Sequence, residues 1–95
     1  MSVYFVVNGT VKDEALLAEY VQAAGASGAL VPMKVLTADT GCEVIEGTPA
    51  GRRTVILEFA SRDDFRTWHD SPEYQAIVGK RLQATDGFAV LANGL

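Results

Sequence analysis

Residues Thr54–Arg81, TVILEFASRDDFRTWHDSPEYQAIVGKR, decide the fold, because a strand pattern in them runs directly into a helix pattern. Residues 54–60 alternate with the period of two that a β-strand requires. The predicted strand therefore has one purely apolar face and one mixed face, formed by Val55, Leu57 and Phe59 and by Thr54, Ile56 and Glu58 respectively.

The helix pattern that follows begins with a recognisable cap. Ser61 precedes Asp64 by three residues, in the arrangement of a capping box, and acidic residues favour a helix N-terminus. Ser71 followed by Pro72 interrupts the pattern and predicts a new N-cap with proline at the first helical position. We therefore expect a broken helix whose apolar stripe consists of Phe65, Trp68, Tyr74, Ile77, Val78 and Leu82.

The rest of the chain supplies one more helix and three more strands. Asp13 is a plausible N-cap, and apolar residues at helical spacing follow it until Pro32. The Asn8-Gly9 pair predicts a turn that closes the first strand. The further strands are predicted at Val3–Asn8, Lys34–Thr37 and Phe88–Ala92.

This order, β-α-β-β-α-β over residues 1–95, predicts one ferredoxin-like α+β domain with a four-stranded antiparallel sheet and two helices on one face. We expect the first and third strands to be parallel neighbours at the sheet centre. The purely apolar strand faces should lie under the helices. The opposite, half-apolar face would be exposed in a monomer, which predicts a homodimer formed through it. That face would carry Tyr4, Val6, Asn8, Thr54, Ile56 and Glu58.

Composition narrows the range of partners and locations. The net charge is −4 and no cluster of basic residues occurs, which argues against nucleic acid as a partner. The N-terminal segment has neither the basic region of a signal peptide nor an apolar run that could span a membrane. A single cysteine, Cys42, cannot form an internal disulfide, so a cytoplasmic location is expected. No metal-binding or phosphate-binding motif is recognisable.

Glu58 is the main candidate for catalysis. A carboxylate on a half-apolar face must be paired, hydrated or shifted in pKa, and in the last case it could act as a general base. The structural alternative is an ion pair with Arg81 or with an arginine of a partner subunit. Tyr4 and Asn8 could orient a ligand by hydrogen bonds, although Asn8 could equally be the residue before a turn glycine.

The remaining candidates are aromatic or lie near the helix break. Trp68 and Tyr74 could stack on a planar ligand, or belong to the core. His69 could act as an acid or base, but its place at a helix end beside Asp70 predicts a solvated capping residue. Cys42 has no histidine or cysteine near it in sequence, so neither a metal site nor a nucleophile is indicated.

Several short motifs together resemble the domain-of-unknown-function family 1330. They are Glu46-Gly47, Leu57-Glu58-Phe59, Trp68, Ser71-Pro72-Glu73-Tyr74 and Arg81. The resemblance covers essentially the whole chain. It implies a ferredoxin-like subunit of the dimeric α+β barrel superfamily, whose two sheets pack face to face, with no established active site to transfer. The sequence departs from the family pattern at Ala38, where a basic residue is common.

The haem-degrading and antibiotic-biosynthesis monooxygenases of the same superfamily are similar in using an Asn on the first strand and a Trp on the second helix, which Asn8 and Trp68 match. Val78 stands where their haem-binding histidine would be, so haem is not expected. No other cofactor is expected either. Two functions remain open. One is a homodimer that binds a small apolar or aromatic molecule between sheet and helices, with Tyr4, Asn8, Trp68, Tyr74 and Arg81 as candidate contacts. The other is a cofactor-independent isomerase or monooxygenase with Glu58 as base.

Overall fold

The computed structural model describes residues 1–95, apart from the side chain of Ala29. The strands are β1 (Val3–Val11), β2 (Met33–Asp39), β3 (Arg53–Phe59) and β4 (Thr85–Asn93). The helices are α1 (Glu14–Ser27), α2 (Arg62–His69), α3 (Pro72–Gln75) and α4 (Val78–Ala84), with a 3₁₀ turn, η1 (Gly28–Leu30), after α1. No helix among the described residues is long and apolar enough to cross a membrane.

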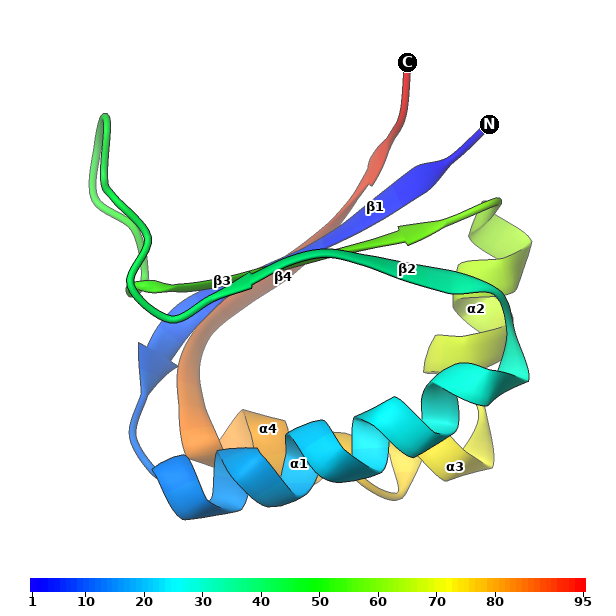
Figure 1. Cartoon of the computed structure of the whole chain (residues 1–95), viewed down its shortest axis with the longest axis horizontal. Helices are drawn as coiled ribbons and strands as arrows, with labels where there is room; N and C mark the ends of the chain where they lie inside the picture. Colours follow the sequence, from blue (N-terminus) through cyan, green and yellow to red (C-terminus); the bar gives the residue numbers. More distant parts are fainter.

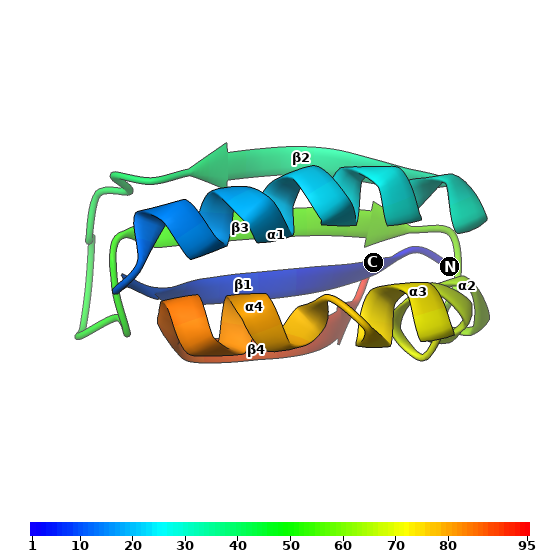
Figure 2. The same ribbon diagram turned by 90° about the horizontal axis from the view of Figure 1, so that it is seen from below.

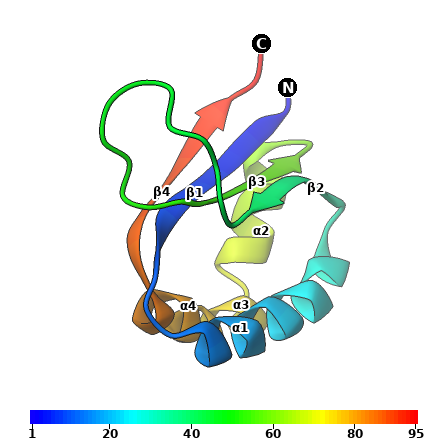
Figure 3. The ribbon, with the colours of Figure 1, turned by 60° about the vertical axis from the view of Figure 1, so that its left-hand side comes forward.

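The sheet has the strand order β2-β3-β1-β4, and the helices lie on one side of it (Figures 1 and 3). Every neighbouring pair is antiparallel. This confirms the predicted ferredoxin-like α+β fold. The expectation that β1 and β3 run parallel is wrong, because β3 returns from β2 as a hairpin and enters the sheet beside β1 in the opposite direction. Tyr4 therefore faces Glu58 across the strands, and Asn8 faces Thr54 at the other end.

Side-chain caps fix where the helices begin, as the sequence predicts. Asp13 Oδ1 accepts a hydrogen bond of 3.0 Å from the Leu16 amide at the start of α1. Ser61 Oγ accepts one of 3.1 Å from the Asp64 amide in α2, and Ser71 Oγ accepts one of 3.1 Å from the Tyr74 amide in α3. Each cap satisfies an amide that has no partner within its own helix.

The core lies between the sheet and the helices, with α1 and α4 running side by side beneath the strands (Figure 2). The alternating residues of β1 and β3 that were predicted to face the helices do so. Val3, Phe5, Val7 and Phe59 are buried there, and Val55 and Leu57 pack against them. The helices contribute Leu17, Tyr20, Phe65, Trp68, Tyr74 and Ala84.

Two local predictions are wrong. β1 does not turn at Asn8-Gly9 but continues to Val11, because Gly51 and Gly87 lack side chains and let their backbones pass close to Gly9. Leu82 is 61% exposed, whereas Arg81 is only 8% exposed. The physical reason is a further break after α3, which restarts the helix at Val78 and brings Arg81 to the inward face.

Candidate functional site

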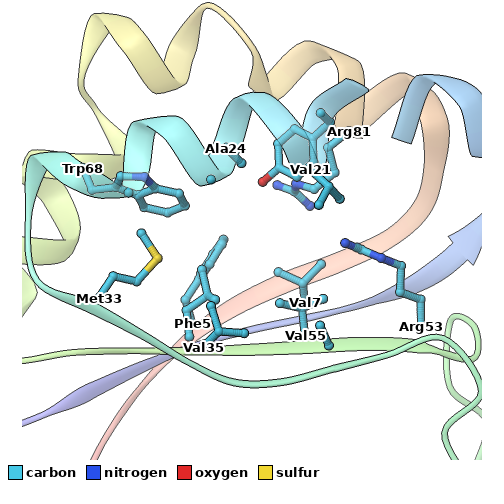
Figure 4. Close-up of a pocket in the computed structure, with 15 residues that line it drawn as sticks. Phe5, Val7, Val21, Ala24, Met33, Val35, Arg53, Val55, Trp68 and Arg81 are labelled. Atoms are coloured by element: carbon cyan, nitrogen blue, oxygen red, sulfur yellow. The ribbon is translucent and has the colours of Figure 1, made fainter. Parts of the chain in front are cut away.

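A cavity of about 390 Å³ lies between the helix-covered face of the sheet and the helices (Figure 4). The volume falls in the lower part of the roughly 300–1,000 Å³ range of small-molecule pockets. Most of its lining is apolar and comes from inward-facing residues of β1, β2 and β3 below and from α1 above. The residues that Figure 4 labels on these elements include Phe5, Val7, Val21, Ala24, Met33, Val35 and Val55.

One end of the cavity is aromatic and rigid. Trp68 is 1% exposed, and its indole lies opposite Met33 in Figure 4. Trp68 Nε1 donates a buried hydrogen bond of 3.1 Å to Ser27 Oγ, and Ser27 Oγ donates in turn to the Ala24 carbonyl oxygen at 2.8 Å. Because the one indole donor is satisfied, the ring is held in place as a flat apolar wall.

The other end carries two guanidinium groups. Arg53 rises from the first residue of β3 and Arg81 descends from α4, and their nitrogens point toward the same end of the cavity (Figure 4). Arg81 is more than nine-tenths buried, and its Nε has no hydrogen-bond partner among the described residues. Arg53 is half-buried. Burial lowers the pKa of the Arg53 guanidinium, the Tyr20 hydroxyl opposes this shift, and the charge of Arg81 adds to it.

Tyr20 lies beside these arginines but does not neutralise them. Its hydroxyl is 2.7 Å from the Tyr74 hydroxyl in a buried hydrogen bond. Burial strongly raises the pKa of Tyr20, and Tyr74 raises it further. The phenol therefore keeps its proton at neutral pH. The Arg81 guanidinium lies over the Tyr20 ring at 6.0 Å, which is a cation–π contact and supplies no counter-charge.

Three residues predicted as ligand contacts lie on the covered side of the sheet, and two of them line the cavity. Trp68 forms part of its aromatic end, and Arg81 part of its charged end. Tyr74 is fully buried behind this surface, with its ring centroid 4.0 Å from that of Trp68. Tyr74 therefore does not line the cavity, but it contacts Trp68 and Tyr20, which do.

Asn8 is committed to structure. Its Nδ2 donates to the carbonyl oxygens of Gly51 and Arg53 and to Thr54 Oγ1, at 2.9, 3.3 and 3.1 Å. Its Oδ1 accepts from the amides of Ala50 and Gly51, at 2.9 and 3.2 Å. The side chain fastens the loop before β3 to β1, and it does not line the cavity.

Glu58 and Tyr4 lie on the open face of the sheet, opposite the cavity. They occupy facing positions of β3 and β1. A hydrogen bond and the negative charge of Glu58 both raise the pKa of the Tyr4 hydroxyl. The ion pair considered between Glu58 and Arg81 does not form, because the two side chains lie on opposite sides of the sheet. Parallel strands would have placed Asn8 and Glu58 toward the same end of the sheet; the antiparallel pairing separates them, so that expectation is wrong, and Tyr4 faces Glu58 instead.

The cavity also contains residues that the sequence analysis did not select, Arg53 and Tyr20. The signal for Arg53 was present, because it continues the alternation of Val55, Leu57 and Phe59 by one step toward the N-terminus. An arginine in phase with a purely apolar strand face indicates a charged group directed into the interior. Its pairing with Arg81 could not be inferred, since that depends on the second helix break.

The remaining candidates have local roles. His69 is less exposed than a capping residue at a helix end should be, with 28% of its side chain accessible. Its ring stacks on Phe65 with a centroid distance of 5.2 Å, and its Nδ1 lies 3.2 Å from Asp70 Oδ1. Cys42 Sγ accepts a hydrogen bond of 3.3 Å from Thr54 Oγ1. The described residues contain no group of three acidic, histidine or cysteine side chains that could hold a metal ion.

The topology and the cavity define a ferredoxin-like α+β protein with a pocket between one face of its sheet and the helices. Residues 2–95 match the model of the domain of unknown function DUF1330, so the chain belongs to that family. The resemblance inferred from the sequence motifs is thereby confirmed. No curated protein matches the sequence.

Solved structures share the fold at low sequence identity. A protein of unknown function from Rhodopseudomonas palustris is 15% identical with a TM-score of 0.83, over 99% of this chain and 82% of that one. A dimeric ferredoxin-like protein of unknown function from Thermobifida fusca is 18% identical with a TM-score of 0.67, over 98% and 92%. SnoaB, a cofactor-independent oxygenase from Streptomyces nogalater, is 16% identical with a TM-score of 0.66, over 99% and 93%. These likenesses concern the fold alone.

Proposed function

We propose that this protein is a homodimer that binds a small apolar or aromatic molecule in the cavity between its sheet and its helices. The observation that carries the proposal is the cavity itself, with about 390 Å³ of space in a chain of 95 residues. Apolar residues that line it are left in contact with solvent, since Val21 and Val35 are 51% and 61% exposed. A ligand that fills the cavity would bury this apolar surface, which is favourable.

The open face of the sheet supports the homodimer. Its central positions carry Val6 and Ile56, and β4 adds Phe88 and Val90, which are 50% and 49% exposed. Large apolar side chains in adjacent strands form the kind of patch that usually serves as an interface. The structural neighbour from Thermobifida fusca is described as dimeric, which is consistent with this use of the fold.

The cavity can be tested by filling it. Ala24 projects into the cavity from α1, whereas Ala26 lies on the same helix, is exposed and does not line it. We expect wild-type protein to bind the neutral fluorescent probe N-phenyl-1-naphthylamine. Ala24→Phe should weaken binding by about tenfold or more, which corresponds to about 1.4 kcal/mol, and Ala26→Phe should not. Circular dichroism would verify that both variants fold, with Ala24→Leu as a milder replacement.

Native mass spectrometry of freshly purified protein provides a second measurement. A retained small molecule in wild type that is lost in Ala24→Phe and kept in Ala26→Phe would support the proposal. Equal probe affinity in Ala24→Phe and wild type, or the absence of probe binding in wild type, would contradict it.

The enzymatic alternative, with Glu58 as general base, requires a different location. Glu58 is on the open face, and none of the described side chains that line the cavity is a carboxylate or an imidazole. A reaction that used Glu58 would therefore take place between two sheets, beside Tyr4, and a ligand in the cavity could not reach it.

A further inference from the structure

We infer that the ligand of the cavity is an organic anion, with an apolar body against Trp68 and a carboxylate or similar anionic group between Arg53 and Arg81. This inference rests on the proposed function and specifies the chemical class of its ligand. It follows from the arrangement of two guanidinium groups at one end of an otherwise apolar space.

Arg81 is buried without a charge partner at its Nε. The residue is 8% exposed, and its Nε has no hydrogen-bond partner among the described residues. A buried charge is ordinarily paired, because removing it from water is costly unless an opposite charge and hydrogen bonds compensate. An arginine that is buried, whose Nε has no partner and that borders the cavity, is therefore positioned for a counter-charge that enters from outside the chain.

The protein supplies no counter-charge of its own to these arginines. The ion pairs among the described residues join Lys12 to Asp86 and Lys80 to Glu19, His69 Nδ1 lies beside Asp70, and none of these contacts includes either cavity arginine. No described residue that lines the cavity is acidic.

Tyr20 is the nearest group that could ionise, but burial favours its protonated form. Its hydroxyl is already engaged with Tyr74 at 2.7 Å. The positive charge at this end of the cavity therefore has no partner within the described chain.

Two arginines from separate elements converge at this end of the cavity. Arg53 and Arg81 come from β3 and α4, both line the cavity, and their nitrogens point toward the same end of it (Figure 4). Burial lowers the pKa of Arg53, and the charge of Arg81 adds to that shift. Like charges held together in a partly buried place repel each other, and an anion between them would replace that repulsion by charge-assisted hydrogen bonds. The guanidinium fork matches the geometry of a carboxylate or phosphate group.

The position of Arg53 also indicates how such a molecule is oriented. Arg53 borders the cavity and, on its other side, a wider surface hollow lined by Thr10, Glu14 and Arg52 among others. The Arg53 side of the charged end therefore borders solvent, whereas Trp68 at the aromatic end is 1% exposed. The anionic group of a ligand would lie on the Arg53 side, and its apolar body against Trp68.

The experiment compares matched acids and amides as probes: benzoate with benzamide, 2-naphthoate with 2-naphthamide, and decanoate with decanamide. Each pair keeps its apolar body and differs in charge. Trp68 is the only tryptophan of the chain and lines the cavity, so its fluorescence reports binding directly. We expect at least one acid to bind about 10- to 100-fold more tightly than its amide, the range of charge-assisted hydrogen bonds.

The variants are Arg81→Met and Arg53→Met, with Arg66→Met as the control because Arg66 is exposed on α2 and does not line the cavity. The preference for the acid should disappear in Arg81→Met, decrease in Arg53→Met and remain in Arg66→Met. Ligand-free Arg81→Met should also melt at a higher temperature than wild type, because an uncompensated buried charge has been removed.

The possible results separate this inference from the proposed function. Equal binding of acids and amides in wild type would overturn the anionic ligand and leave binding in the cavity intact. An acid preference that survives in Arg81→Met would also overturn it, because the charge would then be recognised elsewhere. Failure of every probe to perturb Trp68 would overturn both proposals.

Discussion

The two faces of the sheet are built from the same strands, yet their side chains differ strongly in solvent exposure. On the covered face Val3 and Phe59 are 2% and 1% exposed, and on the open face Phe88 and Val90 are 50% and 49% exposed. The covered face also contains the cavity and its two arginines. Within one chain the helices bury only the covered face, and the open face keeps large apolar side chains in contact with solvent. The open face is therefore the proposed homodimer interface, and the covered face holds the proposed ligand site.

The largest effect is expected on the covered face. Trp68→Ala removes a side chain that is 1% exposed and hydrogen-bonded to Ser27, so unfolding free energy should fall by about 3–5 kcal/mol. Leu82→Ala is the control, because Leu82 is as apolar as a core residue but 61% exposed, and its replacement should cost less than about 0.5 kcal/mol. Urea unfolding of both variants measures the difference, and similar losses would contradict the assignment of the core.

The second effect concerns the open face. Ile56→Asp would place a carboxylate at its centre, and we expect the homodimer to dissociate, with association weakened by about 100-fold or more, which is about 2.8 kcal/mol. Light scattering at micromolar concentration should then give a monomer mass. Ile56→Thr, which keeps the β-branched shape, provides a milder variant if Ile56→Asp does not fold. A monomer mass for wild type under the same conditions would refute the homodimer.

The difference between the faces also explains how far the sequence predicts this protein. Alternation in β3 assigned Val55, Leu57 and Phe59 to the covered face, and the caps at Asp13 and Ser61 marked helix starts, because both signals depend on local physics. These predictions are confirmed.

The site was less accessible to sequence reasoning, because it depends on non-local geometry. The relative direction of β1 and β3 decides whether Asn8 and Glu58 meet, and no pattern within either strand reports it. The break after α3 turns Arg81 inward and Leu82 outward. No Gly or Pro lies between Gln75 and Val78, so the sequence contains no helix-breaking residue that would predict it. The charged end of the cavity follows from that break.

The third prediction concerns the paired tyrosines of the covered side. Tyr20→Phe would leave the buried Tyr74 hydroxyl without the hydrogen bond that it shares with Tyr20, and should cost about 1–3 kcal/mol at neutral pH. The double variant Tyr20→Phe/Tyr74→Phe should recover part of that loss, since no hydroxyl is then left unpaired. Urea unfolding of the two singles and the double gives the coupling energy. Strictly additive losses would show that the hydrogen bond contributes nothing.

The same pair predicts how stability changes at alkaline pH. Below about pH 10 tyrosine is protonated in both the folded and the unfolded chain. Above it the unfolded chain loses these protons while buried Tyr20, with its raised pKa, keeps its own, so folding stability should fall as the pH rises. The double phenylalanine variant should lose less stability between pH 9 and 11, roughly the range where tyrosine titrates. In Tyr4→Phe, a variant of the open face, folding stability should fall over this pH range nearly as much as in wild type.

The smallest effect on the fold is expected for Glu58→Gln, which distinguishes the faces most directly. Glu58 is on the open face and raises the pKa of Tyr4 through a hydrogen bond and its charge. Glutamine removes the charge but keeps the shape, so the pKa of Tyr4 should move down toward its ordinary value, which ultraviolet titration of the tyrosines would detect. Tyr20 should keep its raised pKa, because burial rather than Glu58 is the main cause there.

Ligand binding should be unchanged in Glu58→Gln, because the sheet separates this carboxylate from the cavity, Trp68 and Arg81. A loss of ligand retention would mean that the bound molecule contacts the open face, and the enzymatic alternative with Glu58 as base would then be favoured. A large fall in the urea midpoint with retention intact would instead identify Glu58 as one half of an ion pair across the homodimer interface. Breaking such a pair when it is fully buried costs about 3–5 kcal/mol. A small fall in the urea midpoint, with ligand retention unchanged, would support ligand recognition by the covered face alone.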